Sequence, residues 1–320
     1  MATFPGRSGD ALGGNQFIQS IAPGDNAKRD DLIVQEILKG NMPNFLRQLV
    51  PVTVTEKNNT LIYNVMPDYL ALGDDADYIR VPLSAPSAQK VADAFGCTLP
   101  TAKMSNQIWQ AAAAKLPPKP MSGRTSTIGG KTYSPQDFLK SKMTDTDSFA
   151  EHNRLIQEQL AEHKPGELVA GHKKDVVISN QLASRPDKVA IHGLHNTKGQ
   201  AIQGGSWGHD INYRDYSHGI RLIDRKATLN GKPIDLVKDI LQNQEFAYLV
   251  SDEGALKFTS YSYKKDKDSP VAPSQDSAVA TKTEPATKTE PGQEYTPDKP
   301  KGGREQLLGR IDNFLDQFKT

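Results

Sequence analysis

The spacing of apolar residues changes near residue 165, and this change restricts the folds open to the chain. Before Pro165, apolar side chains recur at helical intervals, as they do over 30–39. After Gly166 they gather in short β-branched runs bounded by turns, which is typical of strands. Helices followed by a sheet predict an α+β fold, in which N-terminal helices and a small hairpin pack with a mainly antiparallel sheet.

Local signals predict the individual elements. A β-hairpin is expected over 50–66 and a further strand over 78–83. Capping residues, prolines and glycines predict helices over 30–39, 84–95, 101–116, 134–143 and 147–162. In the second half we expect strands over 167–171, 175–179, 188–194, 200–204 and 219–223, an Asn-Gly turn at 230–231, a short helix begun by Pro233 and a closing hairpin within 246–263.

Composition predicts how the folded part is bounded. Residues 1–28 are rich in Gly, Asn, Asp and Ser, which predicts an irregular arm. Residues 29–263 are expected to form a single α+β domain, with a helical half over 29–163 and a His-rich sheet half over 164–263.

The C-terminal region has a different character. Residues 264–303 contain almost no apolar side chains and include the consecutive repeats TKTEPA and TKTEPG, so we expect a disordered linker. Residues 304–320 place several leucines and phenylalanines on one helical face, which predicts an amphipathic helix that docks on a protein partner.

Charge and cysteine content exclude several classes. The 39 basic and 38 acidic side chains give a net charge of +1, which provides no field for nucleic acid. The single Cys97 excludes an intrachain disulfide framework and a zinc site made of several thiolates. We find no signal peptide pattern and no apolar run of transmembrane length, so we expect a soluble protein without a transmembrane segment, cytoplasmic or exported by a signal-independent route.

Polar residues capable of chemistry concentrate in one window. Five of the seven histidines lie between residues 172 and 218, among acidic, hydroxyl and basic side chains at expected turns and strand ends. Loops at a sheet edge are where catalytic and binding groups collect. We assign catalytic roles to His172, Asp175, Ser206, His209 and His218, and substrate binding to Lys173, Lys174, Asp215 and Arg221.

Each of these stretches also has a structural interpretation. Residues 171–175 fit a charged hairpin turn as well as a site. Gly204, Ser206 and Gly208 match the nucleophile-elbow pattern, but that elbow needs a following helix, which this sequence does not predict. Ser217 and His218 are adjacent on an expected strand and therefore face opposite ways, so they should not act on each other.

The pair His192 and His195 needs a special backbone to act together. A spacing of three places two side chains on opposite faces of a regular strand. The two imidazoles could share a metal only if Gly193 breaks the strand, and we expect His192 to belong to the strand end and His195 to be exposed. The acidic run over 73–80 lacks the twelve-residue calcium-loop pattern, so we expect a solvated turn there.

Two mechanisms compete for the histidine cluster. In one, His172, His209 and His218, with Asp175 or another carboxylate, hold Zn²⁺ and leave a position for water. In the other, Cys97 is the nucleophile and His218 or His172 its base, in the chain order of papain-like and NlpC/P60 hydrolases. Cys97 follows an expected helix end rather than starting a helix, which favours a buried structural role.

Several motifs together resemble a set of bacterial and phage-associated proteins without an assigned activity. They are LVAGHKKDVVIS, KVAIHGLH and DYSHGIRLI, with DYLALGDDADYIRVPLS and LPTAKM upstream. The resemblance covers roughly residues 29–225. It implies that both halves belong to one unit and that the His-rich strands are its hallmark, and it implies no mechanism.

Two functions are compatible with these patterns. The histidine cluster on glycine-rich turns favours a hydrolase that acts on an extended polymer such as cell-wall peptide or glycan. The alternative is a non-enzymatic assembly or effector protein that docks on a larger protein assembly through residues 304–320.

Overall fold

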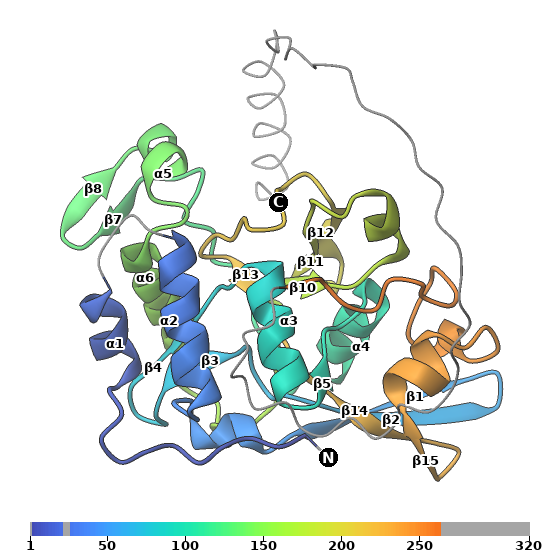
Figure 1. The fold of residues 1–320 in the computed structure, drawn as a ribbon. Helices are drawn as coiled ribbons and strands as arrows, with labels where there is room; N and C mark the ends of the chain where they lie inside the picture. The colour runs from blue at the N-terminus through green and yellow to red at the C-terminus, as the bar shows by residue number, and fades with distance from the viewer. Residues whose placement is uncertain (1, 22–25, 264–320) are drawn as a thin grey trace, which may run out of the picture. The chain divides into compact units, whose positions relative to one another are not determined.

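Helices that precede residue 50 in the sequence and helices that follow it both pack against the strands of this protein. The computed structural model describes residues 2–21 and 26–263, which all fall in one compact unit. Its α-helices are α1 (Gly14–Ser20), α2 (Asn26–Leu38), α3 (Ala85–Ala94), α4 (Ala102–Ala111), α5 (Pro135–Ser141) and α6 (Thr146–Gln159). Helices α2 and α3 lie side by side (Figure 1). Short 3₁₀ or π-helical turns occur at Asn44–Arg47, Asn180–Ser184, Leu236–Leu241 and Ala247–Leu249.

Several helix ends confirm the capping signals. The Thr101 hydroxyl accepts a hydrogen bond from the backbone N–H of Met104 at the start of α4. Ser134 caps α5 in the same way, through the backbone N–H of Asp137. Such side-chain acceptors satisfy amides that the first helical turn leaves without partners.

The N-terminal arm is not irregular throughout, which corrects the prediction for residues 1–28. Helix α1 lies there, and its first residue, Gly14, packs directly against strands β3 (Ala71–Gly73) and β4 (Tyr78–Arg80). A Cβ atom on Gly14 would stand 2.4 Å from the carbonyl oxygen of Leu72. The backbone N–H of Gly14 donates a hydrogen bond to the carbonyl of Asp77. Glycine here permits close packing rather than disorder.

One sheet joins the two predicted halves of the chain. Strands β1 (Val50–Glu56), β2 (Asn59–Val65), β14 (Ile223–Leu229) and β15 (Lys232–Asp235) lie in that order and are antiparallel, and β5 (Cys97–Thr98) also pairs with β14 (Figure 1). The hairpin over 50–66 and the Asn-Gly turn are confirmed. Asn230 and Gly231 both have positive φ, as a two-residue hairpin turn requires.

A second sheet carries the histidine-rich residues. Its order is β12 (Ala201–Ser206), β11 (Ala190–His195), β10 (Lys174–Val177) and β13 (His218–Gly219). The pairs are antiparallel except for β10 with β13, which is parallel. Three smaller pairs complete the strands: β3 with β4, β6 (Ala114–Lys115) with β9 (Val169–Ala170), and β7 (Ser126–Ile128) with β8 (Lys131–Tyr133).

Some local predictions are wrong. The run over 219–223 is divided between β13 and β14 rather than forming one strand. Pro233 lies in the edge strand β15, where its missing N–H removes no ladder bond. The hairpin expected within 246–263 is absent from the described residues, because the apolar side chains there pack into the core from turns and irregular backbone.

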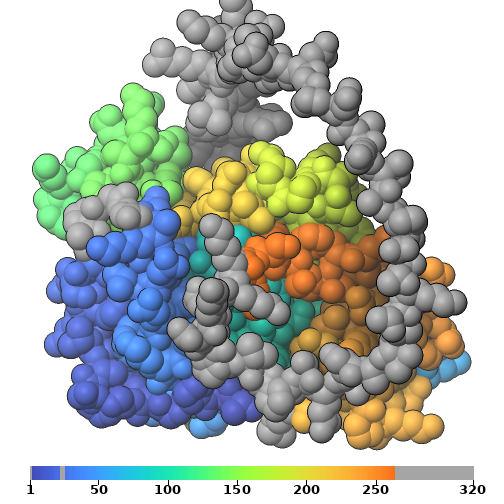
Figure 2. All heavy atoms as spheres, viewed as in Figure 1, coloured from blue at the N-terminus to red at the C-terminus, as the bar shows by residue number. Residues whose placement is uncertain are grey.

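The α+β fold is therefore the observed one. In the space-filling view of Figure 2, the N-terminal residues (blue) and the last described residues (orange) lie on opposite sides of one face, with residues near 100 (teal) between them. None of the helices in the described ranges has both the length and the apolar character that crossing a membrane requires. The linker and docking helix predicted for 264–320 lie outside the described residues.

Candidate functional site

The predicted site residues meet at the paired strands β10 and β13. Lys174 lies opposite His218, and Asp175 lies opposite Gly219, in the parallel register. Residues opposite one another on neighbouring strands share a face of the sheet. Lys174 and His218 therefore share one face, and Asp175 belongs to the other.

Burial is the main difference between the predicted site and the observed one. Turn positions predict exposed side chains, whereas most of these residues are enclosed. Only Ser206 and His209 are partly exposed, and the buried ones are His172, Lys173, Lys174, Asp175, Asp215, His218 and Arg221. A buried charge needs a partner, so the contacts of these groups define what they can do.

Asp215 holds one group of these side chains together. One carboxylate oxygen accepts hydrogen bonds from the backbone N–H (2.8 Å) and the hydroxyl (2.5 Å) of Ser217. The other accepts from Lys174 Nζ at 3.1 Å and the Tyr213 hydroxyl at 3.3 Å. Burial acts to raise the pKa of Asp215, but the Lys174 ammonium and His218 hold it well below its ordinary value. Lys174 and Asp215, predicted to bind substrate, thus neutralise each other.

His218 lies beside this group. Its Nε2 is 3.9 Å from the Asp215 carboxylate, and neither ring nitrogen has a hydrogen-bond partner among the described residues. Burial lowers the pKa of His218 to about 3, so the ring is neutral at pH 7. His209 stacks on Tyr213 with ring centroids 4.0 Å apart and lies 6.4 Å from the His218 ring. As expected, Ser217 bonds to Asp215 rather than to its neighbour His218.

A second group surrounds His172. Its Nε2 lies 3.4 Å from a carboxylate oxygen of Asp68. The other oxygen of Asp68 accepts hydrogen bonds from Arg80 Nε (3.0 Å) and Nη2 (2.5 Å), and Arg80 also donates to the Asn153 side chain. Burial acts to raise the pKa of Asp68, but Arg80 and His172 hold it well below its ordinary value. Burial lowers the pKa of His172 to about 4.

Asp175, on the opposite face of β10, and Arg221, which lies between β13 and β14, both contact Tyr69. A carboxylate oxygen of Asp175 accepts hydrogen bonds from the hydroxyls of Ser105 (2.5 Å) and Tyr69 (3.3 Å). Burial raises the pKa of Asp175 to about 6. The Arg221 guanidinium lies 4.1 Å from the Tyr69 ring centroid and donates to two backbone carbonyls. Arg221 thereby fixes the backbone rather than reaching toward solvent.

Lys173 is equally enclosed. Its ammonium donates to the carbonyl of Tyr216 at 2.6 Å and lies 3.2 Å from His152 Nδ1. Burial lowers the pKa of Lys173 to about 7.

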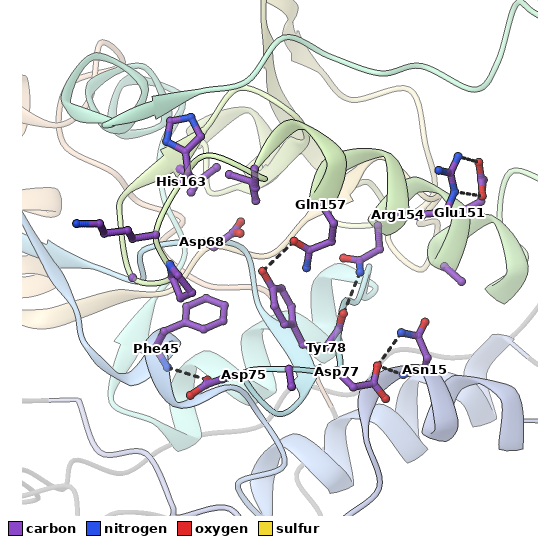
Figure 3. Close-up of a pocket in the computed structure, with 18 of the residues that line it drawn as sticks. Asn15, Phe45, Asp68, Asp75, Asp77, Tyr78, Glu151, Arg154, Gln157 and His163 are labelled. Atoms are coloured by element: carbon purple, nitrogen blue, oxygen red, sulfur yellow. Dashed lines mark hydrogen bonds and ion pairs between the residues drawn. The ribbon is translucent and has the colours of Figure 1, made fainter.

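A cleft of about 740 Å³ opens beside the His172 group (Figure 3). Helices α1 and α6, the turn between β3 and β4, and the segment before β9 supply its walls. Asp68 and Asn153 line this cleft and also contact Arg80, so they connect it to the buried polar groups. Figure 3 shows Asp68 among the side chains lining the cleft.

The cleft walls are acidic and largely held in place. Six carboxylates line the cleft, whereas its basic groups are Arg154, Lys164 and His163; the carboxylates are Asp68, Asp75, Asp77, Asp147, Glu151 and Glu167. Asp77 accepts hydrogen bonds from Asn15, and Asp75 from two backbone amides at the Asn44 turn. His163 lies 3.1 Å from Glu167, and Arg154 pairs with Glu151.

The sequence predictions did not include Asp68, Arg80 or Asn153. A usable signal existed for two of them, because Asp68 and Arg80 are charged residues next to strongly apolar runs on either side of the acidic turn. A charge flanked by buried positions must find a partner, and these two find each other.

The surroundings of the histidines and of Cys97 bear on the two predicted mechanisms, the zinc site and the thiol nucleophile. No group of three or more His, Cys, Asp or Glu side chains placed to hold a metal ion occurs among the described residues. His172 has Asp68 as its neighbouring carboxylate, and His218 has Asp215. Cys97 is buried in β5 of the five-stranded sheet, and burial raises the pKa of its thiol strongly, as the structural interpretation expects.

Comparison with known proteins adds no identification. No protein-family model, no curated protein and no solved structure matches the chain. The resemblance drawn from the motifs stays a prediction.

Proposed function

We propose that the protein is a hydrolase that binds an extended polar polymer, such as cell-wall peptide or glycan, in the cleft at Asp68. Asp68 supports this proposal most, because it lines the cleft and also accepts a hydrogen bond from the buried Arg80. Ionisable groups with perturbed pKa values concentrate at functional sites, and this cleft is the place where the buried cluster reaches a cavity.

Asp68 has the properties of a fixed anionic group. Arg80 keeps it ionised and His172 lies against its other oxygen. Because Asp68 is buried and both of its oxygens already have partners, it can stabilise positive charge that develops on a substrate in the cleft, when a second carboxyl group supplies a proton, but it is not placed to attack the substrate. Glu151 and Glu167 on the cleft walls are the candidates for that second group. His172 then acts as a positioning residue for Asp68.

The charge of the cleft indicates the type of ligand. Carboxylates outnumber the basic groups in its lining. Complementarity therefore favours a polymer that carries amino groups. Cell-wall peptides and deacetylated glycans have this chemistry, whereas polyanions such as nucleic acids do not.

Turnover of soluble peptidoglycan fragments, followed by mass spectrometry, tests the proposal. Glu167→Gln and Glu151→Gln change partly exposed groups, so the fold should be kept, and loss of the proton donor should lower kcat by about 10²–10⁴-fold. Glu158→Gln is the matched control, because Glu158 lies on α6 outside the cleft lining and should keep full activity. No turnover by the wild-type chain, or equal turnover in all three variants, would contradict the proposal.

The burial of seven predicted site residues favours a second candidate, a non-enzymatic assembly or effector protein. In that case the histidines stabilise the fold, and residues 304–320 dock on a protein partner within a larger assembly. Deletion of residues 304–320 separates the two functions. A hydrolase keeps its activity on a small soluble fragment, whereas an assembly protein loses its partner in co-purification.

A further inference from the structure

Strand β11 contains a β-bulge where the sequence reads His-Gly-Leu-His. Gly193 has φ of 129° and Leu194 φ of 50°, and the pairing register with β12 shifts between Ile191 and Gly193. A left-handed conformation is unfavourable for leucine and persists only where the surrounding structure enforces it. Such strain concentrates at functional sites, which makes this bulge a place to look for one.

The bulge turns two histidines toward the same atom. In a regular strand, His192 and His195 would lie on opposite faces. Here Nε2 of each ring lies 2.8 Å from Oδ1 of Asn106 on helix α4, and the ring centroids are 6.0 Å apart. The prediction that His195 is exposed is wrong, because its side chain is buried. The strand is not broken at Gly193, because β11 continues through this stretch, and it is the bulge that brings the two rings together.

The helix side of this group is also fixed. Trp109, one turn after Asn106 on α4, stacks on His195 with ring centroids 5.8 Å apart. Gly199 lies so close beneath Trp109 that a Cβ atom there would stand 2.4 Å from the indole ring. The two imidazoles and the amide are therefore held by packing, as the first ligands of a metal site must be.

We propose that His192, His195 and Asn106 form a binding site for a divalent transition metal such as Cu²⁺ or Zn²⁺. In the structure each Nε2–H donates to Oδ1 of Asn106, so Nε2 of both rings lies 2.8 Å from one position. Metal binding moves the proton of each neutral ring from Nε2 to Nδ1, which frees both Nε2 lone pairs, and Oδ1 of Asn106 then serves as a third ligand. Metal–nitrogen bonds of about 2.0–2.1 Å are shorter than these hydrogen bonds, so the metal occupies the space between the rings and Asn106 shifts outward. Water completes the coordination.

The protonation states suit this role. Burial lowers the pKa of His192, and burial with the neighbouring His192 lowers the pKa of His195 to about 4. Both rings are neutral at pH 7, which is the form that binds metals. With only two imidazoles and an uncharged amide, Cu²⁺ should bind more tightly than Zn²⁺, following the usual order of divalent ions.

Titration of the full chain with CuSO₄ or ZnCl₂, followed by calorimetry, tests the site. We expect one equivalent of Cu²⁺ bound with nitrogen hyperfine structure from two imidazoles in its electron paramagnetic resonance spectrum. His192→Gln and His195→Gln should each weaken binding at least tenfold. His163→Gln is the matched control, because His163 lies on the cleft rim and contacts Glu167 instead.

A gain of affinity provides the second test, which stands even if the histidine variants fail to fold. Asn106→Asp replaces the amide by a carboxylate of the same shape and should tighten Cu²⁺ binding at least tenfold. His172→Gln and His218→Gln remove two of the zinc ligands predicted from the sequence, which were His172, His209 and His218. Both variants should leave Cu²⁺ binding unchanged, which distinguishes the two sites. No stoichiometric binding, binding that survives both His192→Gln and His195→Gln, or an unaltered affinity in Asn106→Asp overturns the proposal.

Discussion

The ring of Tyr69 lies directly against the backbone of Gly219. A Cβ atom on Gly219 would stand 2.4 Å from one ring carbon of Tyr69 and 2.6 Å from the next. Because the tyrosine hydroxyl also donates to Asp175, the ring cannot move away without breaking a buried hydrogen bond. The glycine in β13 thus sets the position of Tyr69 between Asp175, Arg221 and His172.

Gly219→Ala should therefore destabilise the fold by about 1–3 kcal/mol, the usual range for overpacking a core. Chemical denaturation would measure this. Gly204→Ala is the control, because a Cβ atom there meets nothing closer than 3.9 Å and the backbone has an ordinary φ. Equal stability of the two variants would show that Tyr69 can relax.

Arg80→Met removes one partner of a buried ion pair and should lower the free energy of unfolding by about 3–5 kcal/mol, because the Asp68 carboxylate is left buried without its counter-charge. Arg154→Met removes the surface ion pairs of Arg154 with Glu151 and Glu158, and it should change the free energy of unfolding by only about 0–1 kcal/mol. Thermal or urea unfolding of both variants checks the difference. A small effect at Arg80 would mean that water reaches Asp68 easily.

Stability should fall on acidification between pH 6.5 and pH 4. The folded-state pKa values of His172 and His218 lie at about 4 and about 3, below the unfolded value near 6.5, so in this window the unfolded chain binds more protons. Each such histidine contributes a slope of up to about 1.4 kcal/mol per pH unit. Asp175, whose pKa is raised to about 6, has the opposite effect on the pH dependence of stability, because its contribution to the free energy of unfolding is lost as the pH rises through 6.

Urea unfolding at pH 7, 6 and 5 measures this slope. His218→Gln should flatten this slope, because it removes one of the groups whose pKa burial lowers in the fold. A free energy of unfolding that stays constant or increases from pH 7 to pH 5 would contradict the assignment of neutral buried rings.

Cys97 should react only slowly with a thiol reagent in the native protein and rapidly in denaturant, because its thiol is buried and its pKa is raised. Absorbance of the released chromophore follows the reaction. Cys97→Ala should leave any hydrolytic activity intact, and loss of activity in a folded variant would restore the thiol mechanism.

Local structure was predictable because its causes are local. The Thr101 and Ser134 caps and the Asn230-Gly231 turn depend on residues a few positions apart. The pairing of β2 with β14 joins residues about 160 positions apart and leaves no local signal, so the predicted division into a helical and a sheet half missed it.

The candidate site was predictable only in part for the same reason. Clustering in sequence located Lys174, Asp215 and His218, which do meet. It could not show that their charges neutralise one another inside the fold. Asp68 and Arg80 lie outside the histidine window, and only tertiary contact with His172 brings them to it. The convergence of His192 and His195 depends on a backbone bulge that residue spacing leaves open.

The strand order of the larger sheet also determines when the protein can fold during synthesis. The edge of strand β2 that does not face β1 stays unpaired until β14 has been made, and β5 likewise has no partner strand before β14. Early chain segments would therefore stay incomplete while most of the polypeptide is translated, with an unpaired strand edge exposed to other chains. We expect fragments that end before residue 223 to depend on chaperones and to aggregate when released, and slow folding of the whole chain to follow from these distant pairings.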